Sequence, residues 1–407
     1  MSERHGGHLT AALTMALLAV CLPGLSAQTS QLPPANEVQL LAGPVAFYPS
    51  IILRDVGIDS NVRNEADDAK EDFTLTAQPR VRATVPFGSA LFASTATVGL
   101  VYYATYKEQQ SVNWLYEGRL EGSNSRLRPF LAATINHTRA RTGYEIDARV
   151  LRHETTVSGG AELTLTGITS LTFSYRRTIQ NYGENEQFLG VALADQLDHT
   201  SDVAGAGVRY ALTPLTTVSV DMELQRDRFD TLGIRNADSV RVMPGVQFSP
   251  DAVIKGRVAM GFRQFMPQAA GLQGFSGLVG AANVGYTLLN ATTFTVDGTR
   301  DVMYSFVPTT PYYLVTSGHL TVSQRIGGPI EAIALAGQDR LEYQAVEGSP
   351  GAGRVERTRI VGGGVGYRVS PSLRLALIYD RTERVSNQLD RRLYERSRLF
   401  GSVTYGQ

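Results

Sequence analysis

The sequence is almost without cysteine: Cys21 is the only one among 407 residues. Cys21 lies in an apolar N-terminal run that we interpret as part of a cleaved signal peptide. The mature chain therefore has no thiol, which excludes disulfides and thiolate metal sites. An exported chain of this size must gain its stability from its fold alone.

The sequence also lacks net charge and long apolar runs. Lys and Arg total 38, and Asp and Glu also total 38, so the net charge is zero. Nucleic-acid-binding domains are usually basic, and this balance argues against nucleic acid as a partner. Beyond the signal region no segment reaches the ~18 consecutive apolar residues that a transmembrane helix needs. A helical membrane protein is excluded, whereas a membrane β-barrel, whose signal per segment is weaker, is not.

The N-terminal region divides into two short segments ahead of one large domain. Residues 1–27 are predicted to be the signal peptide, because Arg4 precedes the apolar run and Ala27 offers a small residue for cleavage. Residues 28–42 are predicted to be a polar, proline-containing lead-in in the periplasm. Residues 43–407 are predicted to form the folded domain.

Val203–Phe229 is a clear unit of that domain, two alternating strands joined at Pro214. Successive side chains of a strand point to opposite faces, so each strand has an apolar and a polar face. The apolar positions of this unit are Val208, Tyr210, Leu212, Val218, Val220, Met222 and Leu224.

The rest of the chain repeats this pattern and predicts an all-β fold of about 18 strands, with 16 as the alternative count. Short turns alternate strictly with long connections, among them a polar loop at residues 141–153 and a long loop at residues 181–201. A transmembrane antiparallel up-and-down barrel has an even strand number, short periplasmic turns and long outer loops. A soluble sandwich, solenoid or propeller also gives period two. Aromatic residues near both ends of the strands and the lack of disulfides favour the membrane barrel.

Two local motifs resemble a known family. GIDSNVR at Gly57–Arg63 ends the first strand, and Ser-Pro or Thr-Pro turns recur at Pro214, Pro250 and Pro371. These features resemble the β-barrel porin family often found beside exopolysaccharide genes. The family patch that ends the first strand would correspond to Asp59, Asn61 and Val62. The resemblance implies an outer-membrane channel with a link to polysaccharide secretion, and it supplies no catalytic residues.

The polar faces carry the predicted functional residues. In a barrel of about 18 strands the lumen is wide enough for water. Charges on the lipid face are costly, so the charged side chains of the strands are expected to line the lumen. They would either form ion pairs that stiffen the wall or select permeating ions. The predicted lumen-lining residues are Arg80, Arg82, Glu117, Arg119, Arg176, Asp221, Glu223, Arg241, Lys255, Arg257 and Arg374.

We predict a passive channel in the cell outer membrane for small hydrophilic solutes or an exported polysaccharide, with no enzyme activity, cofactor or metal. Its predicted partners are outer-membrane lipid, lipopolysaccharide, the barrel-assembly machinery, which reads the last strand, and polysaccharide secretion components. One alternative is a plugged or structural barrel that anchors a secretion assembly or binds surface glycan through loop aromatics at Tyr304, Phe306, Tyr312 and Tyr313. A further alternative is an outer-membrane hydrolase, for which Asp198, His199 and Ser201 are the candidate cluster.

Overall fold

The computed structural model describes residues 39–122, 124, 126–269, 271–346, 348, 351–388 and 392–406. The predicted signal peptide and most of the predicted lead-in lie outside these residues. The end of the lead-in forms β1 (Leu40–Ala42), which pairs with the beginning of the next strand. Within the described residues, no helix is long and apolar enough to cross a membrane.

The first half of the molecule is a series of antiparallel hairpins. Its strands are β2 (Val45–Asp59), β3 (Asp72–Phe87), β4 (Ala90–Tyr103), β5 (Ser111–Gly122), β6 (Leu127–Arg141), β7 (Arg149–Thr164), β8 (Thr169–Tyr182), β11 (His199–Thr213) and β12 (Thr216–Phe229). The connections contain the short elements η1 (Lys107–Gln109), β9 (Gln187–Phe188), β10 (Val191–Ala192), α1 (Leu193–Leu197) and η2 (Gly233–Arg235).

The second half continues the same meander. Its strands are β13 (Ala237–Phe248), β14 (Ile254–Pro267), β15 (Phe275–Leu288), β16 (Thr292–Tyr304), β17 (Tyr312–Gly327), β18 (Ile330–Gln344), β19 (Val355–Ser370), β20 (Leu373–Ser386) and β21 (Tyr394–Tyr405). The described residues form one 19-stranded sheet, and β1 is the only one of these strands outside the barrel wall. The last strand, β21, pairs with β2 and closes an 18-stranded barrel. The predicted class and count are confirmed, and the alternative of 16 strands is wrong.

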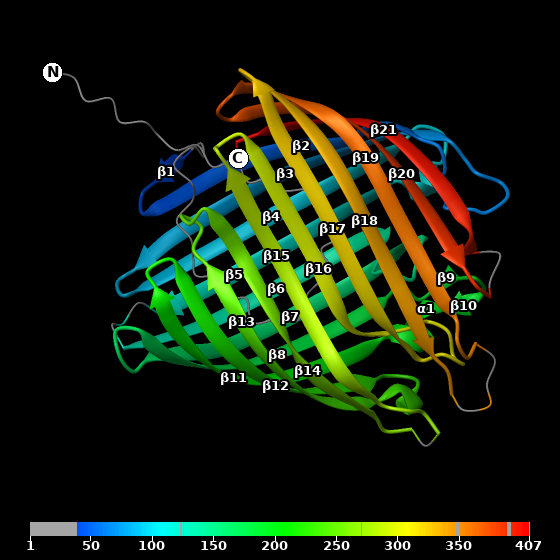
Figure 1. Cartoon of the computed structure of the whole chain (residues 1–407), viewed down its shortest axis with the longest axis horizontal. Coiled ribbons are helices and arrows are strands. Elements are labelled where there is room, and N and C mark those ends of the chain that lie inside the picture. Colours follow the sequence, from blue (N-terminus) through cyan, green and yellow to red (C-terminus); the bar gives the residue numbers. More distant parts are fainter. Residues whose placement is uncertain are drawn as a thin grey trace.

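Short turns and long connections lie at opposite ends of the barrel, as predicted. The long connections gather at the end where β9, β10 and α1 lie (Figure 1). The turn between β3 and β4 consists of Gly88 and Ser89, and Gly88 has a φ of 55° that glycine adopts without steric cost. We call the two ends the turn end and the loop end.

Two predicted loops are shorter or more ordered than the sequence indicated. Residues 149–153 belong to β7, because Arg149 and Val150 pair with the end of β6 and Val150 is buried beside Ile146. Residues 183–198 hold β9, β10 and α1, and the buried side chains of Leu193 and Leu197 explain why this segment folds into ordered structure. Both differences come from tertiary contacts that a strand pattern does not contain.

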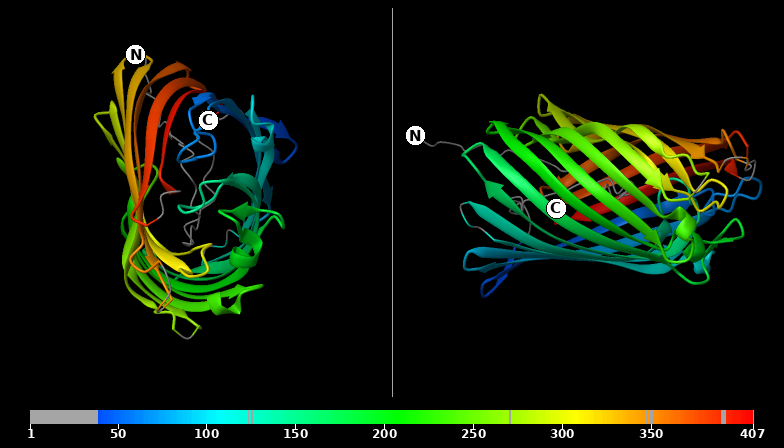
Figure 2. Two further views of the ribbon diagram at one scale, coloured as in Figure 1. Left: turned by 90° about the vertical axis from the view of Figure 1, so that its right-hand side faces the viewer. Right: turned by 90° about the horizontal axis from the view of Figure 1, so that it is seen from below.

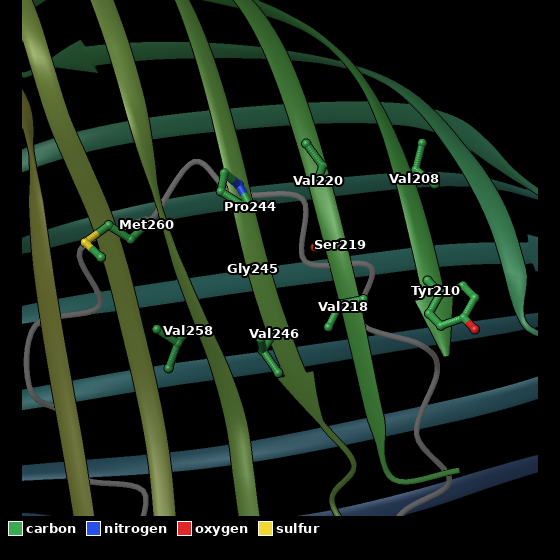
Figure 3. Close-up of a pocket in the computed structure, with 10 residues that line it drawn as sticks. All are labelled: Val208, Tyr210, Val218, Ser219, Val220, Pro244, Gly245, Val246, Val258 and Met260. Carbon is green, nitrogen blue, oxygen red and sulfur yellow. The ribbon is translucent and has the colours of Figure 1, made fainter. Parts of the chain in front are cut away.

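The alternating side chains separate into the two predicted faces. Val208, Val220 and Leu224 are about half exposed on the outside, with exposed fractions of 46%, 49% and 50%. Asp221 and Glu223, on the other face of β12, are each 5% exposed. On β11–β14 the outer face holds an open apolar groove that includes Val218, Pro244 and Met260 (Figure 3). An apolar outer belt around a polar interior is the arrangement of a membrane-spanning barrel.

Candidate functional site

Residues 142–148, which connect β6 to β7, fold into the barrel at its loop end; we call them the inner loop. Glu145 and Ile146 are 2% and 4% exposed, although they belong to a connection rather than to the wall. Asp147 contacts β20, which is six positions away from β6 around the barrel. Figure 2 (left) views the loop end, where chain lies inside the ring of strands. The inner loop therefore reaches across the interior of the barrel.

Three arginines around one glutamate hold the inner loop in place. Glu356, on β19, is fully buried and accepts hydrogen bonds from Arg354 at 3.0 Å, from Arg392 at 3.1 Å and from Arg384. Each of the three arginines is 3% exposed or less. A carboxylate accepts several guanidinium donors at once, and these charge-assisted bonds are short and strong. We call this group the Glu356 cluster.

The Glu356 cluster grips the inner loop through both side chains and backbone. Arg384 donates to the Asp147 carboxylate at 2.7 Å and to the Tyr144 carbonyl oxygen at 2.9 Å. Arg392 lies 3.3 Å from the other Asp147 oxygen and donates to the Glu145 carbonyl oxygen. Guanidinium groups present several donors in a fixed plane, which suits them to fix a loop by its carbonyls.

The loop between β16 and β17 closes over the other side of the inner loop. Ser305 donates its hydroxyl to Glu145 at 2.8 Å, and the Phe306 amide donates to the same carboxylate at 3.1 Å. Burial raises the pKa of Glu145 even though Arg354 and Arg392 lie close by. Arg235 then ties Ser305 to α1, donating to carbonyl oxygens of the β16–β17 loop and to Gln196 at 2.8 Å.

The residues of the family patch join the barrel seam to the inner loop. Asp59 accepts a hydrogen bond at 2.8 Å from Arg396 on β21, across the seam that closes the barrel. Asn61 shapes the first outer loop by donating to the Glu65 carbonyl oxygen and accepting from the Glu65 amide. Val62 is fully buried, and its carbonyl oxygen accepts a bond from Arg141 beside the inner loop. The patch thus has a structural explanation in loop and seam geometry.

Four of the predicted lumen-lining residues meet on the inner face of β12–β14. Asp221 accepts from Arg257 at 2.7 Å, and Glu223 pairs with Arg241. Arg241 also reaches Asp301 on β16 at 3.1 Å, where Arg263 joins at 2.7 Å. This contact between strands that are not neighbours places the group on the concave side of the wall. Most of these charges neutralise one another within the wall.

The other predicted residues are spread around the inner face. Arg119 pairs with Glu121 at 2.9 Å on β5, which also carries Glu117, and Arg374 pairs with Glu331 across β19. The remaining four stand on three strands: Arg80 and Arg82 on β3, Arg176 on β8 and Lys255 on β14. The structure brings them into no common cluster.

Sequence reasoning missed the residues of the Glu356 cluster and the inner loop. The alternation places Glu356 and Arg384 on the polar faces of β19 and β20, which is a signal for an inward position, and Arg354 directly precedes β19. No local pattern indicates that Glu145 and Asp147 fold inward to meet them. The apolar inner cluster of Ile333, Leu335, Ala376 and Ile378 was also missed, because these residues stand where polar side chains were expected.

The residues proposed for glycan binding and for hydrolysis have other roles in the structure. Phe306, Tyr312 and Tyr313 are 1–3% exposed, and Tyr304 packs on Phe229 while it donates to Asp227. The rings of Phe306, Tyr312 and Tyr313 are buried and offer no face for sugar stacking, and Tyr304 is partly buried. The candidate hydrolytic residues also have other partners: Asp198 accepts from the Tyr182 amide, His199 contacts the Leu197 carbonyl oxygen, and Ser201 accepts from Gln225. They form no nucleophile–base pair.

Asp198 makes the order of residues 183–198 sensitive to pH. Burial, with some repulsion from Asp230, raises the pKa of Asp198 to about 6. The folded loop thus favours the neutral acid, and this stabilisation is present below the unfolded pKa near ~4 and is lost as pH rises through about 6. We expect hydrogen-exchange protection of residues 183–198 to fall as the pH rises from about 4 to about 6 and to stay level above about pH 7. Asp198→Asn should abolish this fall, and Asp251→Asn, in an exposed turn at the other end, should leave it unchanged.

The closed barrel, its apolar outer belt and its charged inner face define an outer-membrane channel of the porin class. The family model described as "Putative beta-barrel porin 2" matches residues 34–405, and the chain belongs to that family. It is therefore a porin-like protein that sits in the outer membrane among its lipids and lipopolysaccharide. No curated protein matches the chain in sequence.

Solved porin structures are similar to this chain only at low values. The outer membrane protein OpdK of Pseudomonas aeruginosa is 12% identical, with a TM-score of 0.49 over 88% of this chain and 97% of that one. OccK3 (OpdO) of the same organism is 13% identical, with a TM-score of 0.47 over 88% of this chain and 95% of that one. At these values the likeness carries no argument about solutes.

Proposed function

We propose that the channel passes small hydrophilic solutes passively through a lumen that the inner loop narrows at the loop end. The observation that carries this proposal is the anchoring of the inner loop by Arg384 on β20 and by Arg392 in the connection between β20 and β21. A loop fixed across the interior limits the cross-section without closing the whole barrel. Such a fixed constriction favours small solutes over a polymer, so the polysaccharide route stays a prediction without support from this geometry.

We further propose a modest preference for anions. Around the turn-end mouth, Arg325, Arg368 and Arg374 lie near one another with Glu331 as the nearby acid. Farther around the inner face, Arg80 and Lys255 have no acidic partner among the described residues. A surplus of fixed positive charge along a pore raises the local concentration of anions.

Planar-bilayer recording of the refolded protein tests both proposals. We expect discrete conductance steps, and under a KCl gradient a reversal potential displaced toward that of chloride. Arg325→Gln combined with Arg368→Gln should shift the reversal potential toward zero, because it removes two cations from the mouth. The matched control is Arg359→Gln with Arg381→Gln, which removes two cations from the outer surface and should leave the potential unchanged. An absence of conductance steps in the wild type would contradict an open channel.

Three further predictions concern the barrel-assembly machinery, enzyme activity and secretion components. The last strand ends on Tyr405, whose side chain is 45% exposed on the outer face beside Leu373, and such a strand suits recognition by the barrel-assembly machinery. We infer that the protein performs no covalent chemistry, in keeping with its membership of a porin family. Secretion components as partners stay a prediction, since no contact of the described residues points to them.

A further inference from the structure

The outer surface of β16–β20 carries a group of arginines close to the loop end. We call Arg300, Arg340, Arg357, Arg359 and Arg381 the arginine patch. Four of the five are exposed, and Arg300 is half-buried. Their strand positions share the parity of outward residues such as Val296, Val361 and Tyr379, so they stand on the lipid-facing side.

The patch places like charges directly opposite each other. Arg340 on β18 pairs in register with Arg357 on β19, and Arg359 follows two residues later on the same face. Like charges at such cross-strand positions repel and destabilise a sheet. Arg340 and Arg381 have the acidic neighbours Glu342 and Glu395, but Arg357 has no acidic partner among the described residues. The repulsion is therefore only partly relieved within the protein.

On β8–β13, outward arginines at the loop end are paired in register with acidic residues. At the loop end of β8–β13 the outward residues in register are Arg177, Asp202, Arg226 and Asp238. Charges alternate along this row, and each arginine faces an aspartate on at least one side. Within the arginine patch, Arg359 likewise faces Glu383 on β20, so the departure from this pattern is the pair of Arg340 and Arg357.

The patch lies at the border between the apolar belt and the outer loops. On β18 the outward residues toward the turn end are the polar Gln338 and then the exposed Ala336, and on β19 they include the exposed, apolar Val361 and Val365. The loops face outward when the tight turns face the periplasm. Outward residues at the loop end of the apolar belt therefore meet the headgroups of the outer leaflet.

We propose that the arginine patch binds the phosphate groups of a phosphorylated glycolipid in the outer leaflet. Guanidinium groups match phosphate oxygens in a bidentate manner, and a phosphate between Arg340 and Arg357 converts their repulsion into attraction to a shared anion. The apolar residues next to the patch would contact the acyl chains of the same lipid. The site is on the outer wall and does not depend on the proposed route through the lumen.

Native mass spectrometry of the detergent-solubilised full-length barrel tests this site with lipid A that carries both phosphates as the probe. We expect Arg340→Gln with Arg357→Gln to weaken binding by about tenfold or more. The matched control is Arg177→Gln with Arg226→Gln, which removes the same charge from the alternating row and should change binding by less than about twofold. Lipid A without phosphates should bind the wild type as weakly as the intact lipid binds the patch variant.

A second variant separates loss of the site from loss of the fold. Arg357→Glu places an acid opposite Arg340, so it should abolish lipid A binding while the barrel melts at the same or a higher temperature. Inorganic phosphate at the same concentration should not compete with the lipid, because it lacks the acyl contacts. Equal loss of binding in the patch and control variants, or full displacement by inorganic phosphate, would overturn the proposed glycolipid site.

Discussion

Glu356→Ala is expected to destabilise the barrel by about 3–5 kcal/mol, the usual cost of removing one partner of a buried ion pair. Glu356 is fully buried and is shared by Arg354, Arg384 and Arg392. Its loss leaves three buried guanidinium groups with Asp147 and Glu145 as the nearby acids, which are too few to neutralise them. Urea unfolding of the refolded protein in lipid vesicles measures the change.

The same variant should also alter the channel itself. Without Glu356, Arg384 and Arg392 are no longer held in position, so their hydrogen bonds to the inner loop weaken. We therefore expect a larger and noisier single-channel conductance. Glu395→Gln is the matched control, because the Arg381–Glu395 pair is 53% and 64% exposed and exposed pairs contribute ~1 kcal/mol or less. Unchanged stability and unchanged conductance in Glu356→Ala would contradict the role of the Glu356 cluster as an anchor.

Val220→Lys is expected to cost about 2–4 kcal/mol of folding free energy in vesicles. Val220 is 49% exposed on the outer face and lies in the apolar run from Val218 to Leu224, before the outward Arg226. A lysine there would place its charge in the hydrocarbon region of the membrane. The fraction of protein that folds into phosphatidylcholine vesicles, measured across a urea series, reports the loss.

Thr217→Lys provides the control for this prediction. Thr217 lies on the same strand with the opposite parity, so a lysine there faces the interior of the barrel. It should leave the folding free energy within about 1 kcal/mol of the wild-type value, as expected for a substitution that disturbs no buried contact. Equal losses in the two variants would contradict the assignment of the two faces.

Most of the barrel could be predicted from the sequence because its signals are local. Alternation along β12 separates Val220 from Asp221, and tight turns such as Gly88–Ser89 lie between adjacent strands. Each signal spans only a few neighbouring residues, so neither needs knowledge of the rest of the fold. The lipid environment reinforces the pattern, since it penalises outward charge throughout the belt.

The candidate site could be predicted only in part. The inward direction of Asp221, Glu223, Arg241 and Arg257 follows from the alternation, but their mutual pairing depends on the register between strands. Arg384 and Asp147 are 237 residues apart in the chain and meet only across the closed barrel. The burial of Tyr312 and Tyr313 likewise depends on loops that pack over them, and aromatic composition alone does not contain that information.

The sequence by itself determined the class of the fold, its two faces and the opposite ends of turns and loops, because period-two alternation and turn residues act over a few positions. The tertiary structure alone decided that residues 142–148 fold inward and that Arg384 and Arg392, 28 and 36 residues from Glu356 in the chain, join Arg354 around it. It also decided which outward arginines face an acid and which face one another. Those outcomes depend on strand register and barrel closure, which bring together charges that the chain keeps far apart.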